Sequence, residues 1–159
     1  RLKKPSSIFG KLRRRGLPLS IDSIIENIHD VAGVRVICPF INDIYAITEM
    51  LCKQDDIFLL NKEDYIKDPK PNGYRSMHLV VEVPVFFSNN KQHVKVEIQI
   101  RTIAMDFWAS LEHQIHYKKD LNAPENLIQE LKECADIIAE TDERMQVLQK
   151  RLAKLNKAK

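Results

Sequence analysis

The sequence lacks several features that mark particular classes of protein. It has only four glycines, no glycine-rich phosphate-binding loop of the Walker type, and no protein-kinase signature. No apolar run approaches the ~20 residues that a bilayer-spanning helix needs, so we expect no membrane partner. If phosphates bind to this chain, side chains rather than a backbone cradle must hold them.

Cysteines are also few. Cys38, Cys52 and Cys134 are far apart and odd in number, and they match neither zinc-ligand spacing nor a disulfide framework. Because their neighbours are apolar, we expect buried free thiols in a reducing, cytoplasmic environment.

Charge is distributed unevenly along the 159 residues, which suit one domain. The net charge of +3 is too small to demand a nucleic-acid partner, but basic residues crowd the start of the chain. Residues 5–15 predict a short basic helix that Gly16 and Pro18 end. Lys3, Ser7 and Lys11 recur every four residues, which would place them on one helical face. That face is either a solvated basic stripe or a surface that grips a triphosphate.

The rest of the pattern predicts strands interleaved with helices. We expect strands at 31–38, 57–60, 78–85 and 93–101, and helices at 20–28, 42–53, 103–117 and from 125 nearly to the end. The helix side chains expected to point inward are Ile21, Ile24, Ile25, Ile28, Ile44, Ile47, Met50 and Leu51. A mixed α/β sheet with helices packed on it follows.

The strand at 93–101 is the most informative one. Alternation gives it one apolar face, of Val94, Val96, Ile98 and Ile100, and one polar face, of Lys95, Glu97, Gln99 and Arg101. The polar face is either a solvated outer face, common in antiparallel sheets, or a functional cluster. In the second case a carboxylate is flanked by an amide and a guanidinium that can hold phosphates.

Asp30 lies just ahead of the strand that contains Arg35. With a second carboxylate on a neighbouring strand, it would hold Mg²⁺ through few protein oxygens while substrate phosphates complete the shell. A helix end or a turn explains Asp30 equally well. The pair His29-Asp30 resembles the core of a metal-hydrolase motif, but no other histidine lies at supporting spacing upstream, and we reject that interpretation.

The loop at 64–76 contains two prolines and an Asn-Gly pair, which make it irregular. Gly73 permits a tight turn, and Tyr74 offers an aromatic face on which a base can stack. Lys70, Arg75 and His78 add cationic or titratable donors. A simple turn with Tyr74 in the core is an equally good explanation.

Taken together, four motifs resemble the synthetase domain of the RelA/SpoT family. They are Arg1-x-Lys3-x-x-x-Ser7-Ile8-x-x-Lys11, Asp30-Val31-Ala32-Gly33-Val34-Arg35, Lys70-Pro71-Asn72-Gly73-Tyr74-Arg75-Ser76-x-His78, and Val96-Glu97-Ile98-Gln99-Ile100-Arg101-Thr102 with Met105-Asp106-x-Trp108-Ala109-x-x-Glu112-His113. They follow the family order. The chain looks like the single-domain branch, the small alarmone synthetases, and leans towards the RelP-type group. This resemblance implies a nucleotidyltransferase-like mixed sheet flanked by helices, in a catalytic domain at 1–118.

The same resemblance implies a reaction: the β,γ-diphosphate of ATP moves to the 3′-hydroxyl of GDP or GTP, and AMP is released. Asp30 and Glu97 would be the catalytic residues that bind Mg²⁺, and Glu97 would also take the proton of the attacking hydroxyl. The residues implied for ATP are Arg1, Lys3, Ser7, Lys11 and Arg35, with the two arginines around adenine. Those implied for the guanine nucleotide are Lys70, Asn72, Tyr74, His78 and Gln99, with Tyr74 stacked on guanine.

The last helix carries a heptad seam of Leu127, Leu131, Cys134, Ile138, Thr141, Met145, Leu148, Leu152 and Leu155. Packing on the parent domain explains such a stripe, and so does a partner helix. So long a helix would protrude from a small domain, and small alarmone synthetases form tetramers through helices of this kind. We therefore expect 119–159 to be a helical oligomerisation extension of a homo-oligomer, a tetramer by this resemblance.

Three other functions stay open at this point. A noncatalytic nucleotide- or RNA-binding domain would use the basic helix and Tyr74, but it gives no role to Asp30 and Glu97. Another nucleotidyltransferase would release pyrophosphate instead of AMP. A scaffold built on the last helix leaves the polar strand face unexplained. RNA also stays open as an additional partner of a synthetase.

Overall fold

The computed structural model describes residues 2–28, 31–117 and 125–157. Helices and strands there follow the order α1 (Pro5–Arg14), α2 (Ile21–Asn27), β1 (Ala32–Cys38), α3 (Ile41–Cys52), β2 (Phe58–Asp64), β3 (Met77–Phe86), β4 (Lys91–Thr102), α4 (Ile103–Tyr117) and α5 (Glu125–Lys157). Every predicted helix and strand is present. None of the described helices combines the length and apolarity that crossing a membrane requires.

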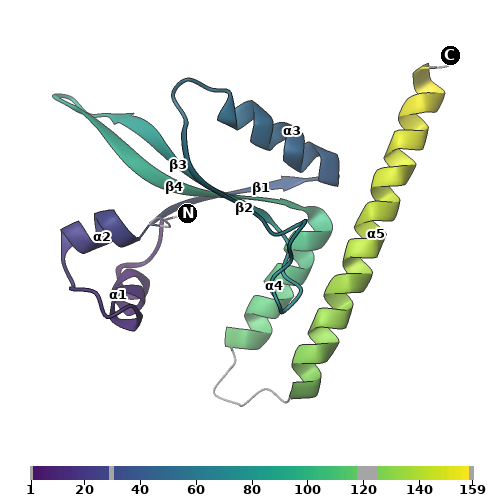
Figure 1. The fold of residues 1–159 in the computed structure, drawn as a ribbon, viewed down its shortest axis with the longest axis horizontal. Helices are drawn as coiled ribbons and strands as arrows, with labels where there is room; N and C mark the ends of the chain where they lie inside the picture. The colour runs from purple at the N-terminus through teal and green to yellow at the C-terminus, as the bar shows by residue number, and fades with distance from the viewer. Residues whose placement is uncertain (1, 29–30, 118–124, 158–159) are drawn as a thin grey trace. The chain divides into compact units, whose positions relative to one another are not determined.

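The strands form one four-stranded sheet in the order β1-β4-β3-β2 (Figure 1). β3 and β4 are a hairpin, whose turn is closed by a 2.8 Å hydrogen bond from Phe87 N to Asn90 O. β1 points the same way as its neighbour β4, which makes the sheet mixed and confirms the predicted fold class. β2 continues to Asp64, beyond its predicted end at Leu60, because an exposed edge strand tolerates polar residues.

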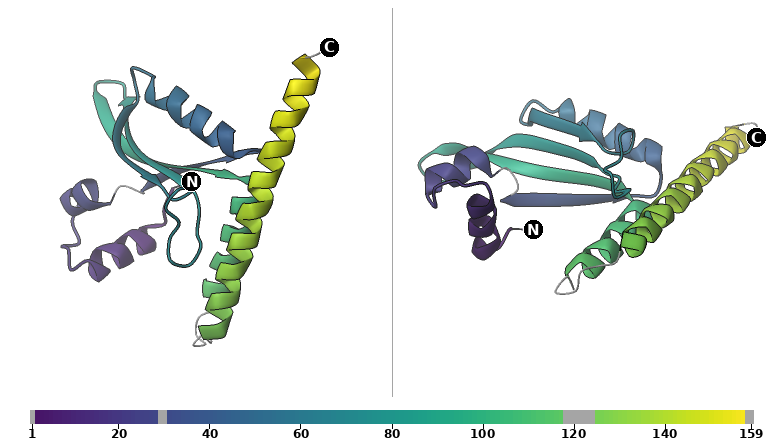
Figure 2. Two further views of the ribbon diagram at one scale, coloured as in Figure 1. Left: turned by 45° about the vertical axis from the view of Figure 1, so that its right-hand side comes forward. Right: turned by 60° about the horizontal axis from the view of Figure 1, so that its bottom comes forward.

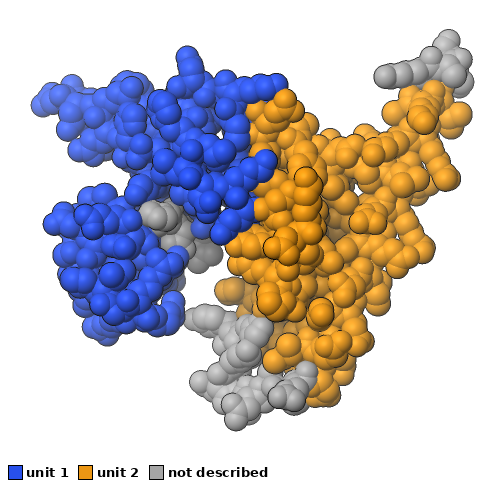
Figure 3. Space-filling model, in the orientation of Figure 1, with its two compact units in different colours: residues 1–36, 50–63, 78–99 blue, residues 37–49, 64–77, 100–159 orange. Residues whose placement is uncertain are grey.

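The chain divides into two compact units that interleave along the sequence (Figure 3). Unit 1 comprises residues 1–36, 50–63 and 78–99, and unit 2 comprises 37–49, 64–77 and 100–159. All four strands contribute residues to both units. The units are described separately below.

In unit 1, α1 and α2 share a small apolar core. Ile8, Leu12 and Ile28 are buried there, with Ile24 among the side chains packed against them. Pro5 opens α1 where no N–H is needed, and Gly16 follows the helix at φ 67°. Ser20 caps α2, because its Oγ accepts a 3.1 Å hydrogen bond from Ser23 N.

Two of the isoleucines predicted to point inward from α2 do not. Ile21 and Ile25 are 74% and 62% exposed. The helix has only two turns, and its buried face is formed by Ser23 and Ile24, with Ile28 at its end. Met50 at the end of α3 is likewise 55% exposed, whereas Ile44 is fully buried.

The cysteines differ from expectation as well. All three are free thiols, but only Cys38 is buried, and Cys52 and Cys134 are exposed. Burial, aided by the nearby carboxylate of Asp43, raises the pKa of the Cys38 thiol.

The 33-residue helix α5 packs on α4 (Figures 1 and 2), and the sequence pattern does not predict its most buried residues. Ala135, Asp142 and Gln146 are its buried residues. Thr102 Oγ1 donates to Asp142 Oδ2, and Asn42 N donates to Gln146 Oε1 at 2.8 Å. A small residue and paired polar groups therefore hold α5 against the rest of unit 2.

The first half of the heptad seam shares this face of α5: Leu127, Leu131 and Ile138 are half-buried, and Ile138 packs against Trp108, Ala109 and Ala135. The later members of the seam are exposed: Met145 49%, Leu148 49%, Leu152 62% and Leu155 66%. The two explanations of the apolar stripe are thus not alternatives. The first half of the seam helps to pack the helix on its own unit, and the second half is exposed.

Candidate active site

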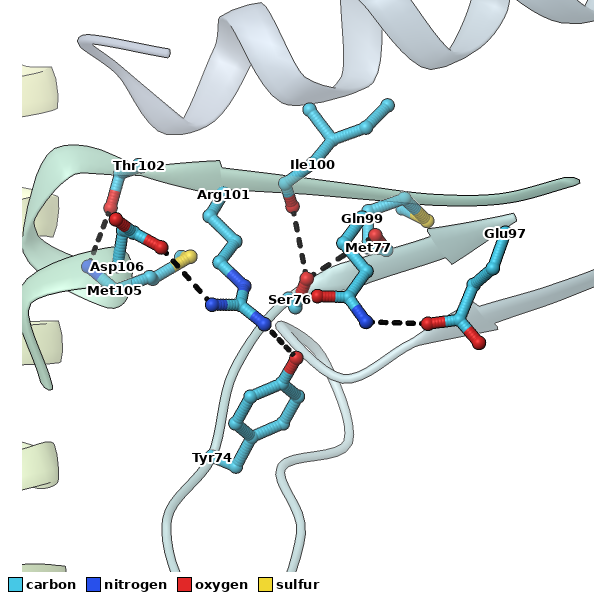
Figure 4. Close-up of polar contacts among 10 residues, drawn as sticks. All are labelled: Tyr74, Ser76, Met77, Glu97, Gln99, Ile100, Arg101, Thr102, Met105 and Asp106. Atoms are coloured by element: carbon cyan, nitrogen blue, oxygen red, sulfur yellow. Dashed lines mark hydrogen bonds and ion pairs between the residues drawn. The ribbon is translucent and has the colours of Figure 1, made fainter. Parts of the chain in front are cut away.

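A carboxylate, an amide and an imidazole meet in unit 1. Glu97 and Gln99 are two residues apart on β4 and so share a face of the sheet. Gln99 Nε2 donates to Glu97 Oε1, a bond drawn in Figure 4. His78, on the adjacent strand β3, brings Nδ1 to 3.9 Å from the same oxygen. All three are residues predicted from the sequence, and the structure brings them together.

This polar face is not a solvated outer surface. The side chains of His78 and Glu97 are only 13% and 21% exposed. The hydrogen bond from Gln99 orients the carboxylate of Glu97, and the His78 ring lies beside the same oxygen. A partly shielded carboxylate of fixed orientation can accept a proton or take a place in the shell of a hard cation.

The residues around Glu97 fit a metal ion that is held partly by the protein and partly by the phosphates of a bound substrate. Within residues 2–28, 31–117 and 125–157, no group of three or more His, Cys, Asp or Glu side chains could enclose a metal ion. Mg²⁺ needs no such group, because one or two carboxylates and substrate phosphates suffice. Glu97 has the right donor chemistry. The predicted second carboxylate, Asp30, lies outside the described residues, as does Arg1.

The other residues predicted for ATP also lie in unit 1. Ser7 and Lys11 share a face of α1 four residues apart, and Arg35 is exposed on β1. Lys3 is not on that helical face. It precedes the helix in an extended segment, where its N–H donates to Val31 O at 2.9 Å, because Pro5 opens the first turn. The single stripe predicted for Lys3, Ser7 and Lys11 is therefore wrong for Lys3.

The loop of residues 65–76 in unit 2 surrounds Tyr74 with oriented groups. Arg101 Nη2 donates to the Tyr74 hydroxyl oxygen at 2.6 Å. The Lys70 ammonium lies 5.2 Å from the centre of the Tyr74 ring and 4.4 Å from that of Tyr65. The two rings meet edge to face at 6.2 Å. Tyr74 is thus held at its hydroxyl, at one edge and by a cation.

The same ring also contacts the core, as the structural explanation of Tyr74 predicts. It packs against the cluster of Trp108, Ala109 and Ala135, where α4 meets α5. Trp108 Nε1 donates to Leu131 O at 2.8 Å, which fixes the indole against α5. One part of Tyr74 is therefore structural, and the ring remains only partly buried.

Helix α5 supports the turn that carries Tyr74. Gly73 has φ 89°, and a Cβ at this position would lie 2.6 Å from Ala135 Cβ. Arg75 donates to Gly73 O at 3.1 Å and to Asp136 Oδ1 at 3.1 Å. Asn72 Oδ1 accepts from Tyr74 N at 3.2 Å, in the manner of an Asx turn. Glycine is required here for both conformation and space.

Arg101 does not have the role that its place in the strand suggests. The alternation of the strand makes its guanidinium a candidate phosphate ligand, but the side chain is 5% exposed and bound within unit 2. Nη1 donates to Asp106 Oδ1 at 3.1 Å, and Nη2 binds Tyr74 (Figure 4). Sequence reasoning misses this link because Tyr74 precedes Arg101 by 27 positions, and no pattern connects the two.

The junction between β4 and α4 completes the arrangement. Thr102 Oγ1 accepts a 3.1 Å hydrogen bond from Met105 N, as a helix N-cap does, while its hydroxyl donates to Asp142. Ser76, at the end of the loop, donates to Ile100 O at 3.3 Å. The end of β4, the start of α4 and the Tyr74 loop are thereby fixed to one another.

Comparison with known proteins agrees with these features. The family model described as "Region found in RelA / SpoT proteins" matches residues 1–122. The chain is 52% identical over 145 residues to a Bacillus subtilis protein named GTP pyrophosphokinase YwaC, covering 91% of this chain and 69% of that one.

Two solved structures from the same organism are also similar. Small alarmone synthetase 2 from Bacillus subtilis has a TM-score of 0.87 and 50% identity, over 95% of this chain and 78% of that chain. Small alarmone synthetase 1 from Bacillus subtilis, bound to its product pppGpp, has a TM-score of 0.87 and 38% identity, over 96% and 77%.

Proposed function

The chain belongs to the RelA/SpoT family, and from this premise we propose that it is a small alarmone synthetase. It acts as a GTP pyrophosphokinase, transferring the β,γ-diphosphate of ATP to the 3′-hydroxyl of GDP or GTP. The observation that carries the proposal is the cluster of Glu97, Gln99 and His78, a shielded carboxylate of fixed orientation. Neither an RNA-binding module nor a scaffold needs such a group.

The reaction forms a bond between O3′ of the guanosine and the β-phosphorus of ATP, and it breaks the bond from that phosphorus to the AMP oxygen. Glu97 takes the proton of the 3′-hydroxyl, while Gln99 holds the carboxylate in position. His78 lies beside the same oxygen and contacts the guanine nucleotide. Positioning and charge neutralisation supply most of the rate in such phosphoryl transfers.

ATP is bound by basic residues in this proposal. Lys3, Ser7 and Lys11 hold its phosphates, and Arg35, together with Arg1, holds adenine. Asp30 and Glu97 are the residues that would hold Mg²⁺, which when bound neutralises phosphate charge. Support comes from the exposed position of Arg35 on β1 and from the shared face of Ser7 and Lys11.

The guanine base stacks on Tyr74. The ring is partly buried, fixed at its hydroxyl and close to the Lys70 ammonium, which suits an aromatic platform beside a phosphate-bearing ligand. Asn72, adjoining this turn, lies near the edge of the base. These substrates are cytoplasmic nucleotides, so we place the enzyme in the cytoplasm.

Product analysis tests the proposal. The chain is incubated with Mg²⁺, ATP labelled at the γ-phosphate, and GDP, and the nucleotides are separated. We expect label in guanosine tetraphosphate with an equal amount of AMP. Release of pyrophosphate would instead identify a different nucleotidyltransferase. Salt-dependent RNA binding without any nucleotide product would favour the RNA-binding alternative.

The exposed seam of α5 supports a further part of the proposal, a homo-oligomer of the tetrameric kind. Leu148 and Leu152 present apolar surface that helix pairing would cover. Light scattering after gel filtration gives the mass. Leu148→Glu should lower that mass without unfolding the chain, whereas Lys150→Glu, an exposed change on the same helix, should not. A monomeric wild-type chain at micromolar concentration would refute this part.

A further inference from the structure

Arg101 is a buried cation whose two hydrogen bonds suggest a positioning role. It lies near the end of β4 with 4% of its surface exposed, and its guanidinium contacts two groups from different parts of unit 2. Nη1 bonds to Asp106 in the first turn of α4, and Nη2 bonds to the phenolic oxygen of Tyr74 (Figure 4). A strand residue thus links a helix to a loop.

This link constrains the direction of the Tyr74 ring. A guanidinium is planar and rigid, so two bonds from different nitrogens fix where each partner lies. Asp106 sets the orientation of the fork, and the second nitrogen sets the position of the phenolic oxygen, 2.6 Å away. Tyr65 meets the ring at its edge. The ring is therefore held before any ligand arrives.

We propose that Arg101 is a positioning residue for recognition of the guanine base, and that it acts through the hydroxyl of Tyr74. The inference rests on the proposed function, in which guanine stacks on this ring. Stacking on a ring that is already fixed avoids the ordering cost that a mobile ring would impose. Losing the anchor should therefore weaken binding of the guanine nucleotide and leave ATP binding unchanged.

The experiment measures dissociation constants of GDP and of a non-hydrolysable ATP analogue by titration calorimetry on the full chain. Tyr74→Phe removes only the hydroxyl and keeps the stacking ring. Arg101→Lys keeps the charge but replaces the planar fork, with its two separate nitrogens, by a single ammonium nitrogen. The double variant completes a double-mutant cycle. Tyr45→Phe is the control, because it likewise removes a tyrosine hydroxyl that is hydrogen-bonded within unit 2, where it donates to Asp64 Oδ2 at 3.2 Å.

We expect Tyr74→Phe and Arg101→Lys each to weaken GDP binding by about tenfold, the scale of one charged hydrogen bond. The ATP analogue should bind as before. The double variant should bind GDP no more weakly than the single variant with the lower affinity, because both changes break the same hydrogen bond. Tyr45→Phe should bind both ligands like the wild type. KM for the guanine nucleotide should rise in parallel, with kcat nearly constant.

Other outcomes would overturn the inference in distinguishable ways. If Tyr74→Phe binds GDP like the wild type while Tyr74→Ala does not, the ring is needed but its anchor is not, and Arg101 is only structural. If Arg101→Lys weakens both ligands equally, the effect is on folding. If Tyr74→Ala leaves GDP binding intact, or the wild type binds no GDP, the proposed role of Tyr74 itself fails.

Discussion

The residues predicted to bind ATP in unit 1 and the tyrosine predicted to stack on guanine in unit 2 are held in opposite ways. In unit 1, Ser7 and Arg35 are exposed side chains on a short helix and an outer strand. In unit 2, Tyr74 is anchored by Arg101, and its turn is pressed against α5 by Gly73. Every buried polar or charged residue that the structure describes, except Ser23, lies in unit 2.

This difference corresponds to two kinds of ligand recognition, one of phosphates and one of a base. Exposed charges can attract a triphosphate without a rigid frame, because a phosphate accepts ligands from many directions. A flat base recognised by stacking needs a ring of defined orientation. In unit 2 the buried guanidinium of Arg101 supplies that orientation through its hydrogen bond to the Tyr74 hydroxyl. Changes in unit 1 should mostly affect activity, whereas changes in unit 2 should affect stability too.

The strongest test of this contrast is Glu97→Gln in unit 1. The amide keeps the shape and the contact with Gln99 but cannot take a proton, so turnover should fall by about a thousandfold or more. The melting temperature and ATP binding should stay close to the wild type. Glu82→Gln is the matched control, because Glu82 also lies beside a histidine, His93, at 3.4 Å on the same two strands. Turnover of Glu97→Gln within a few-fold of wild type would remove this residue from the role of base.

Substituting one glycine in each unit compares how tightly the two units are packed, through the change in the free energy of unfolding. Gly16 in unit 1 has φ 67°, and a Cβ added there would have nothing within 4 Å, so Gly16→Ala should cost only backbone strain, about 1 kcal/mol. Gly73→Ala adds a contact of 2.6 Å with Ala135 Cβ and should cost about 3 kcal/mol in total. Chemical denaturation measures both.

A cycle with Ala135→Gly separates the two contributions at Gly73. The double variant should be less destabilised than the sum of the single variants, because the crowded methyl is gone while the strain remains. Strict additivity would show that α5 moves away from the loop at no cost. If Gly16→Ala and Gly73→Ala lower the free energy of unfolding equally, the turn at Gly73 is not packed more closely than the one at Gly16.

How well the sequence predicts each region follows the same division. The strand face with Glu97 and Gln99 is predictable because alternation is local, and His78 is identified through its motif. The role of Arg101 is not, since its partner Tyr74 lies on a distant loop. The role of Ala135 is not predictable either, because the need for a small residue at this position comes from its close contact with Gly73.

The last helix shows the same limit. Its heptad seam follows from leucine spacing, whereas no hydrophobic pattern reveals its most buried residues, Ala135, Asp142 and Gln146. The prediction of burial is wrong for two of the cysteines, because apolar sequence neighbours do not determine which way a helical side chain points.

A smaller effect is expected from Lys11→Ala in unit 1. The loss of one phosphate-binding charge should weaken ATP binding by about tenfold while leaving the melting temperature unchanged. The contribution of Lys11 to ATP affinity should decline as salt is added, because an ion pair near the surface is screened. Lys150→Ala on α5 is the control and should leave ATP binding as in the wild type. A clear fall in stability with Lys11→Ala would show that unit 1 also uses this residue structurally.

The smallest effect concerns Asp142, the buried carboxylate of α5. Burial raises its pKa above the ordinary value, and the hydrogen bond from Thr102 offsets only part of that rise. Because the folded-state pKa lies above the unfolded one, the stability that this group contributes is full in acid and is lost as pH rises through the folded-state pKa. Asp142→Asn keeps an oxygen to accept the Thr102 hydroxyl and never carries charge.

The variant should therefore melt at a higher temperature than the wild type at pH 7, and the difference should shrink as the pH is lowered towards the pKa of Asp142. Melting curves across this range measure it. Glu143→Gln changes an exposed carboxylate of the same helix and should show no comparable pH dependence. An asparagine variant that is less stable at pH 7 would mean that unit 2 needs the charge itself at this position, and that its buried network tolerates an ion better than its burial implies.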